Sequence, residues 1–322
     1  METRQAKIKP VPVIISRLFI LAQLIAGCST AQHPQPDTAG ATVTDICDDA
    51  RYARFAAMKL ENAFNAAMQQ ANALQSASVS YKIAAAAAKD SMTAAALSVL
   101  SFVQSKQKAD ATRQLLEGKR KYDNAIRLLK LREGRLHNVI QTTFDGAVAS
   151  EGKPIATGNH QNLASVVGCS ATQTLKVKAT SNCSLAPDDN GSVKYSQVDL
   201  NAATQLKHLT EESLKPQTIT AMAYGMGAAG TAITAHTKLH GYCANDGTGN
   251  DLNDKTAVIG ATITLNSRPS NTEQTPLYKT GTSGECKQKE ISATWGEHKP
   301  RTLANALCEV RNQPLSIHQP LH

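Results

Sequence analysis

The chain has 322 residues, a formal net charge of +8, 19% charged residues and only 4% aromatic residues. So few aromatic residues argue against a compact globular enzyme. The sequence has no basic run interleaved with aromatic residues, which argues against a nucleic-acid-binding protein. The length allows one large elongated domain or two ordinary ones.

Residues 1–31 have the composition of a secretory signal peptide. A basic start is followed by the apolar run Leu18 to Ile25 and by small residues that predict cleavage after Ala31. The segment Ile25-Ala26-Gly27-Cys28 also fits the cleavage pattern of a bacterial lipoprotein, in which Cys28 would carry the lipid. The sequence leaves both interpretations open.

The stretch from Thr42 to Glu117 contains no glycine and no proline, and its apolar residues follow a seven-residue repeat. This pattern predicts a long helix whose apolar stripe, called the seam here, packs against other helices. Because many seam residues are alanine, the helix needs length and partners to be stable. Ser78 is its one polar break. The predicted seam residues are Ile46, Ala50, Ala53, Ala57, Leu60, Phe64, Ala67, Ala71, Leu74, Tyr81, Ala85, Ala88, Met92, Ala95, Val99 and Phe102.

A second apolar pattern follows and predicts an antiparallel helical hairpin over residues 42–145. The expected turn lies either near Ser76 to Ser80 or within Gln104 to Asp110. The residues of this second pattern are Tyr122, Ile126, Leu129, Glu133, Leu136 and Ile140.

Residues 146–294 change in composition to glycine, proline, asparagine and serine, which predicts a loop-rich head lobe with short strands. We expect strands at Leu175 to Val177 and at Val258 to Leu265, and a helix near Asn201 to Leu214. Residues 295–313 predict a closing helix, and residues 314–322 a disordered tail. The apolar residues of the closing pattern are Trp295, Leu303, Ala306, Leu307 and Val310.

Six cysteines remain once the signal segment is removed, and an even number in an exported chain indicates up to three disulfides. Fifteen connectivities are possible for six cysteines. The absence of C-x-x-C spacing argues against a zinc site. The six are Cys47, Cys169, Cys183, Cys243, Cys286 and Cys308.

Two sequons match the acceptor for N-glycosylation, at Asn182 and Asn190. Asn190 is the better candidate, because Asp188-Asp189-Asn190-Gly191 has the composition of a surface turn. Asn182 is the weaker candidate, because the neighbouring Cys183 could be held in a disulfide.

Three motifs that resemble active-site patterns lack the surroundings that their chemistry needs. Gly225 to Gly230 spells G-x-G-x-x-G without the βαβ rhythm of a dinucleotide site. His236 and His240 have metal-ligand spacing, but Thr237 stands where a zinc protease needs glutamate. The acidic pairs Asp188-Asp189 and Glu211-Glu212 are isolated. We therefore predict no enzyme, no cofactor and no metal site.

The order of these parts resembles the N-terminal domain of the trypanosome variant surface glycoproteins, the class called type A. The resemblance covers residues 42–250 well and the remainder loosely. It is carried by Cys47 near the mature N-terminus, the alanine-rich run Ile83 to Ala88, Gly134-Arg135-Leu136 with Val139 to Thr142, Cys169 and Cys183 in the loop-rich lobe, and Cys243 in Gly241 to Asp246.

The resemblance implies a mainly α fold: an elongated antiparallel long-helix hairpin or coiled-coil bundle with a disulfide-linked, loop-rich head lobe containing short strands. It implies an elongated surface-coat domain over residues 32–313, pairs Cys47 with Cys183 and Cys169 with Cys243, and leaves Cys286 and Cys308 to pair with each other.

Members of that family reach the cell surface through the secretory pathway, form homodimeric rods through the long helices, and vary antigenically under host antibodies. A lipid anchor on a C-terminal domain holds them on the plasma membrane. This chain stops at His322 without a second cysteine-rich domain or an anchor signal, so we expect a truncated or incomplete product.

Two alternative functions remain open. The same scaffold could serve as a receptor subunit for a host nutrient carrier such as transferrin, in which case the head lobe should present a large apolar patch or pocket. The chain could also be a bacterial lipoprotein or an enzyme. If it is a lipoprotein, Cys28 carries the lipid.

Overall fold

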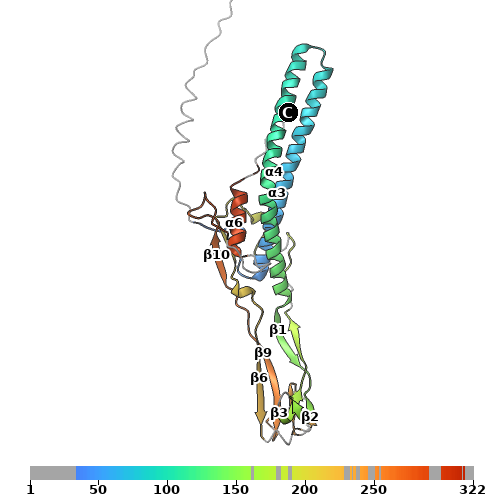
Figure 1. The fold of residues 1–322 in the computed structure, drawn as a ribbon, viewed down its shortest axis with the longest axis vertical. Coiled ribbons are helices and arrows are strands. Elements are labelled where there is room, and N and C mark those ends of the chain that lie inside the picture. The colour runs from blue at the N-terminus through green and yellow to red at the C-terminus, as the bar shows by residue number, and fades with distance from the viewer. Residues whose placement is uncertain are drawn as a thin grey trace, which may run out of the picture.

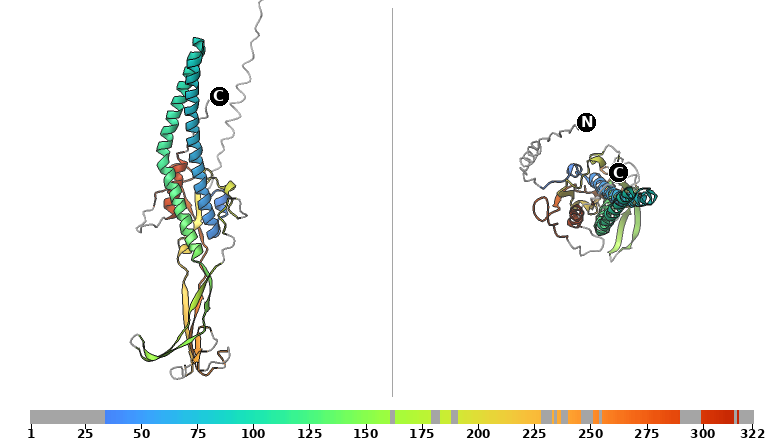
Figure 2. Two further views of the ribbon diagram at one scale, coloured as in Figure 1. Left: turned by 90° about the vertical axis from the view of Figure 1, so that its right-hand side faces the viewer. Right: turned by 90° about the horizontal axis from the view of Figure 1, so that it is seen from above.

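The computed structural model describes residues 34–160, 163–178, 183–187, 191–227, 233, 235–236, 240–245, 251–253, 255–289, 299–313 and 315. Two long helices, α3 (Ile46–Ala87) and α4 (Ser91–Gln141), form a hairpin. Figure 1 shows the hairpin turn at one end of the molecule, a strand-rich lobe at the opposite end, and α6 (Pro300–Arg311) packed beside the middle. The two views in Figure 2 show how narrow the rod is across its long axis.

Each long helix begins at an aspartate that satisfies a free backbone N–H of its first turn. The carboxylate of Asp45 accepts a hydrogen bond from the N–H of Asp48, and the carboxylate of Asp90 accepts one from the N–H of Thr93. The short helix α2 (Thr38–Ala41) begins in the same way at Asp37. Only three residues, Ala88 to Asp90, separate the end of α3 from the start of α4.

The hairpin turn is therefore at Ala88 to Asp90, and both of the expected turn positions were wrong. Ser78, in the first expected turn, is buried between the helices, and its hydroxyl donates to the carbonyl of Ser101 at 3.0 Å. It also lies 2.7 Å from the hydroxyl of Ser105. These cross-hairpin bonds satisfy the polar break of the seam without ending the helix.

The predicted seam is correct in its first half and wrong after the turn. Ala67, Ala71 and Leu74 are buried against α4 as expected, where they pack on Ala111 and Leu115. Beyond the turn, however, the predicted residues Met92, Val99 and Phe102 are 83%, 61% and 69% exposed. The three-residue turn does not preserve the phase of the repeat, so α4 faces α3 through Ser101 and Gln104 instead.

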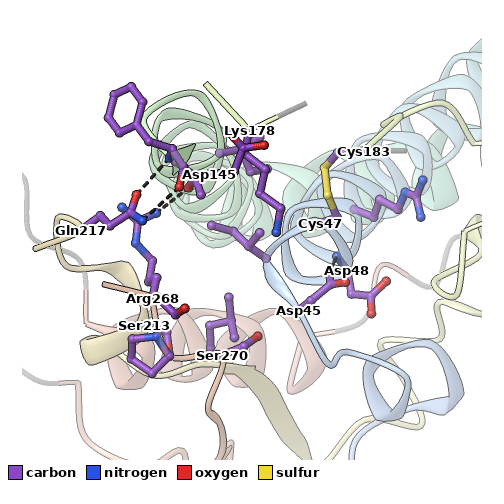
Figure 3. Close-up of a pocket in the computed structure, with 18 of the residues that line it drawn as sticks. Asp45, Cys47, Asp48, Asp145, Lys178, Cys183, Ser213, Gln217, Arg268 and Ser270 are labelled. Atoms are coloured by element: carbon purple, nitrogen blue, oxygen red, sulfur yellow. Dashed lines mark hydrogen bonds between the residues drawn. A yellow bond between two sulfur atoms is a disulfide. The ribbon is translucent and has the colours of Figure 1, made fainter. Parts of the chain in front are cut away.

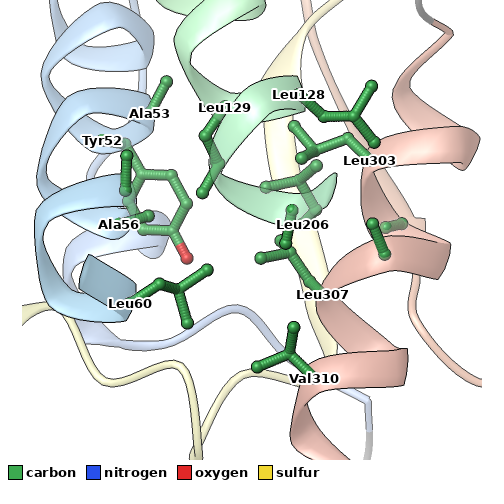
Figure 4. Close-up of a cluster of buried hydrophobic side chains, with 14 of the residues drawn as sticks. Tyr52, Ala53, Ala56, Leu60, Leu128, Leu129, Leu206, Leu303, Leu307 and Val310 are labelled. Atoms are coloured by element: carbon green, nitrogen blue, oxygen red, sulfur yellow. The ribbon is translucent and has the colours of Figure 1, made fainter. Parts of the chain in front are cut away.

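The largest hydrophobic core lies in the middle of the rod, where α6 packs against the hairpin (Figure 4). Tyr52, Ala56 and Leu60 of α3 meet Leu128 and Leu129 of α4 there. Leu303, Leu307 and Val310 of α6 close the core from the other side, together with Leu206 of strand β5 (Gln205–Leu209). The expected closing helix is thus present, although Trp295 lies outside the described residues.

The helix expected near Asn201 to Leu214 was wrong. The segment forms β5, which pairs antiparallel with β10 (Thr272–Pro276), and then the short 3-10 helix η2 (Glu212–Leu214). A further 3-10 turn, η1, covers Tyr195–Gln197. Burial of Leu206, His208 and Leu209 in the strand outweighs the weak local helical pattern.

The head lobe consists of antiparallel strands. β1 (Phe144–Ala149) pairs with β4 (Gln173–Val177), and β2 (Lys153–His160) pairs with β3 (Leu163–Ser170). A four-stranded sheet has the order β6-β9-β8-β7. Its strands are β6 (Ile219–Met226), β7 (Ala235–His236), β8 (Tyr242–Ala244) and β9 (Val258–Leu265). The strand expected at Val258 to Leu265 is present, and the predicted fold class is confirmed.

Candidate functional site

Three disulfides clip the molecule at separate places. Cys47 in the first turn of α3 is bonded to Cys183, Cys169 in β3 to Cys243 in β8, and Cys286 to Cys308 in α6. The sequence separations are 136, 74 and 22 residues. These are the same pairs that the family resemblance implies. The first two disulfides close long loops and so restrict the unfolded chain strongly. Each therefore adds about 3–5 kcal/mol to the free energy of unfolding.

A groove of about 1060 Å³ lies where the base of the hairpin meets the head lobe (Figure 3). The Cys47–Cys183 disulfide forms part of its wall, and three carboxylates and three basic side chains line it. Several of these charged groups already serve the fold: Asp45 caps α3, Asp48 accepts from Thr44 and from the hydroxyl of Ser192, and Arg51 donates to the carbonyl of Ser184 at 2.6 Å. The groove is therefore a polar junction between hairpin and lobe.

Two side chains fasten the end of α4 to the head lobe in this groove. Arg268 donates to the carbonyl of Val139 at 3.1 Å and to the hydroxyl of Thr143 at 2.9 Å. Gln217 accepts from the N–H of Phe144 at 2.9 Å and donates to its carbonyl at 3.0 Å, so the amide acts as a backbone partner. Partial burial lowers the pKa of the Arg268 guanidinium below its usual value.

A buried ion pair joins both long helices to β5. Arg132 of α4 donates to the carboxylate of Asp49 of α3 at 2.9 Å and 2.5 Å, and also to the carbonyl of Leu209 at 3.2 Å. The same carboxylate accepts from the N–H of Leu209 at 2.8 Å. The prediction that Glu133 lies on the apolar stripe is wrong, because Arg132 is the buried residue. Arg132 lies three residues after Leu129 and four residues before Leu136, and this helical spacing is the signal that could have identified it.

His208, which no sequence pattern singles out, is fully buried beside this ion pair. Its Nδ1 is 2.9 Å from the carbonyl of Leu209 and its Nε2 is 2.8 Å from the hydroxyl of Thr275. Because a carbonyl only accepts, Nδ1 carries the proton, and in the neutral ring Nε2 accepts from Thr275. Burial lowers the pKa of His208, and the charge of Arg132 lowers it further.

The motifs that resembled active sites are dispersed in the structure. The G-x-G-x-x-G run begins inside β6, an antiparallel strand, whereas a dinucleotide site needs a parallel βαβ unit. His236 lies in β7, and His240 forms a β-bridge with Glu151. Glu211 and Glu212 form ion pairs with Arg135 and Lys215. Over the described part of the chain, no group of three or more potential metal ligands comes together.

Several predicted features fall outside the described residues. They are the signal segment with Cys28, the sequons' Asn182 and Asn190, the acidic pair Asp188-Asp189, and the tail apart from Leu315. Among the helices that the structure does describe, none is both long enough and apolar enough to span a bilayer.

One face of the hairpin near its turn is apolar and uncovered. We call Val79, Ile83, Met92, Val99 and Phe102 the hairpin apolar face; each is at least 44% exposed. At about 100° per residue, Val79 and Ile83 lie about 100° and 140° around α3 from the inward Ser78. Val99 and Phe102 lie about 160° and 100° around α4 from the inward Ser101, in the same rotational sense. Since the helices are antiparallel, equal rotation brings both stripes to one side of the hairpin.

Comparison with known proteins identifies the fold. No protein-family model and no curated protein sequence matches the chain. Among solved structures, a variant of the variant surface glycoprotein VSGsur soaked in suramin aligns with a TM-score of 0.71 and 23% identity, covering 89% of this chain and 79% of that one.

The same variant without suramin aligns with a TM-score of 0.72 and 21% identity, over 89% of this chain and 79% of that one. VSGsur bound to suramin aligns with a TM-score of 0.70 and 21% identity, over 89% and 74%. The resemblance found in the sequence is thus confirmed in three dimensions, and the chain has the fold of the trypanosome variant surface glycoproteins.

Proposed function

We propose that this chain is a trypanosome surface-coat antigen that acts as a spacer and has no catalytic role. The observation that supports this most strongly is the rod itself, in which a 42-residue and a 51-residue helix run side by side. A helix of 40 residues is about 60 Å long, so such a hairpin keeps the head lobe at a set distance from whatever holds the other end. In this proposal the signal peptide, residues 1–31, is removed, and residues 32–313 form the coat domain.

The proposed assembly is a homodimer that forms through the long helices. The hairpin apolar face supports it, because five large apolar side chains exposed near one another mark a surface that packs against a partner. The α3 and α4 stripes have the spacing of helices that pack in bundles. A second copy presents the same stripes, so a two-fold contact matches apolar residues with apolar residues.

The coat role also accounts for the uneven distribution of stability. The largest core, the buried ion pair and two of the three disulfides lie at the middle and at the base of the hairpin, whereas the head lobe has smaller buried clusters and one disulfide. Sequence changes in the loops of such a lobe cost little stability, which suits antigenic variation under antibody pressure. We propose that Asn190, and less so Asn182, carries an N-linked glycan in this lobe.

The direct test is surface labelling. The full-length chain with an internal epitope tag is expressed in bloodstream trypanosomes, and live, unpermeabilised cells are stained. Surface staining, with a loss of mass after N-glycosidase treatment that Asn190→Gln abolishes, is the expected result. Retention inside the cell, or lipid on Cys28 in mass spectrometry of the mature N-terminus, would contradict the proposal.

A receptor on the same scaffold is the second candidate, because the head lobe does present apolar side chains. Strand β6 exposes Ile219, Met222, Tyr224 and Met226 by 45–50% each. The purified chain is immobilised, and transferrin and matched serum proteins are passed over it. A receptor for a serum carrier would retain its ligand. A pure coat antigen would retain none of them.

A further inference from the structure

A second pocket, of about 500 Å³, lies at the middle of the rod, where α3, α4, α6 and the segment from η1 to Asn201 meet. Among the described residues, none lines both this pocket and the groove at the base of the hairpin. Pockets that hold small organic molecules commonly enclose about 300–1,000 Å³. We call this one the mid-rod pocket, and its size suits a small organic ligand.

The inner wall of the mid-rod pocket is apolar and fixed. Leu60 of α3 and Val310 of α6 lie at the lower end of the core in Figure 4, and both line the pocket. Each is only 5% exposed, because core packing holds it in place. The other apolar side chains of the wall are Ala63, Tyr122, Val198, Leu200, Leu307 and Leu315. An apolar group that enters this pocket leaves water for apolar surroundings, which is favourable.

Lys59 brings an ammonium group to the pocket without a carboxylate partner. Its Nζ lies 4.4 Å from the centre of the Tyr195 ring, and Asn62 fixes that ring by donating to its hydroxyl at 2.9 Å. Attraction to a ring face holds a cation in place but does not neutralise its charge. The neighbouring carboxylate of Glu61 pairs with Lys130, and no described carboxylate forms an ion pair with Lys59.

Arg311 brings a second cation to the same pocket. Its guanidinium donates to the carbonyl of Ala203, which leaves further N–H groups that can bind an anion. Asp199 is the one carboxylate among the described lining residues, and it already accepts from the N–H of Asn201 at 3.0 Å. With two cations against one engaged carboxylate, the pocket attracts an anion.

From these observations we propose that the mid-rod pocket binds an amphipathic monoanion, a molecule with one carboxylate and an apolar chain or ring. The carboxylate faces Lys59 and Arg311, and the apolar body lies against the wall that Leu60 and Val310 help to form. A fatty acid and an aromatic acid share this chemistry, and the experiment below separates them. The binding does not depend on the proposed coat role, so surface staining of cells and ligand binding can fail separately.

Calorimetric titration of the full, unaltered chain tests the proposal. The probes are decanoate and 2-naphthoate, with decanol and 2-naphthol as their neutral counterparts. At least one acid should bind at one site per chain, about tenfold or more tighter than its alcohol, because only the acid meets the two cations. Binding of decanoate alone would identify a fatty acid as the ligand, and binding of 2-naphthoate alone an aromatic acid. Binding of neither acid at millimolar concentration, or equal binding of acid and alcohol, would overturn the proposal.

Filling the pocket locates the binding. Ala63 lines the pocket and is exposed on α3, so Ala63→Trp places a large side chain in the pocket without disturbing the core. The variant should lose acid binding by about tenfold or more. Ala66→Trp, also at an exposed alanine of α3 but away from the pocket lining, is the matched control and should bind normally. Unchanged binding by Ala63→Trp would overturn the proposal.

Removing the charge tests the role of Lys59. Lys59→Gln should weaken acid binding by about tenfold and leave alcohol binding unchanged, whereas Lys59→Arg should retain acid binding because it keeps the cation. Lys82→Gln is the control, since Lys82 is exposed on the same helix beside the hairpin apolar face. Acid binding that Lys82→Gln weakens and Lys59→Gln does not would place the acid on the hairpin apolar face and overturn the proposal.

Discussion

At the scale of single residues, the buried Asp49–Arg132 pair is the most consequential interaction that the sequence did not reveal. Arg132→Met should lower the free energy of unfolding by about 3–5 kcal/mol, because it leaves a carboxylate buried without its partner. Asp49→Asn combined with Arg132→Met should cost less, since the neutral amide still accepts from the N–H of Leu209. Denaturant unfolding of the two variants makes the comparison.

Arg54→Met is the control for this pair. It breaks a partly exposed ion pair with Glu133 on the same two helices and should cost less than about 1 kcal/mol. A loss from Arg132→Met no larger than that of the control would show that the buried pair does not stabilise the hairpin.

His208 should make stability depend on pH. Its pKa in the folded chain lies below the ordinary value of 6.5, so the unfolded chain takes up the proton first as the pH falls. The contribution of the neutral ring is therefore complete above about pH 6.5 and is lost progressively below it. The charged groups facing the ring are Arg132 of α4, Asp49 of α3 and Glu273 of β10.

His208→Asn removes this titration, and its amide can still donate to the carbonyl of Leu209. The Tm of the unaltered chain should fall more steeply than that of the variant between pH 7 and pH 5. Parallel curves would contradict the assignment. His208 could not be identified from the sequence alone, because its burial depends on β5 lying against the hairpin.

At the scale of elements, the long helices were predictable because Thr42 to Glu117 lacks glycine and proline and carries a repeat. The turn was not, because Ala88-Lys89-Asp90 lacks the residues that usually mark one, and only the Asp90 cap distinguishes it. Strand β5 was missed for another reason. Its pairing partner β10 is more than sixty residues away, so no local pattern announces it.

The hairpin seam contains a polar layer that should cost stability. Gln104 is fully buried, and neither its amide nitrogen nor its amide oxygen has a hydrogen-bond partner. Gln104→Leu should therefore raise the free energy of unfolding by about 1–3 kcal/mol, because burying an unpaired amide costs that much.

Ser101→Ala is the contrasting variant in the same layer. Its hydroxyl donates to the carbonyl of Ser78 at 2.9 Å, so its removal should lower stability by about 0.5–1.5 kcal/mol. Unfolding in guanidinium chloride measures both. Destabilisation by Gln104→Leu would contradict the conclusion that the buried amide costs stability.

At the scale of the whole molecule, fold and disulfide framework agree with the expectation drawn from the resemblance, whereas the exposed surfaces emerged only from the structure. The sequence placed Val99 and Phe102 in the seam, and the structure places them on the hairpin apolar face. Because these side chains are exposed and not packed inside the hairpin, they lead to a prediction about assembly. Large apolar side chains exposed near one another mark a surface that binds another protein.

The measurement that tests the account most directly is the molar mass of the full chain in solution by sedimentation equilibrium. The account predicts a dimer at micromolar concentration that Ile83→Lys combined with Phe102→Lys converts to a monomer. Ala84→Lys, on the neighbouring residue of α3 but off the hairpin apolar face, should leave the dimer intact. A monomeric unaltered chain, or a dimer that the paired lysines do not disturb, would contradict it.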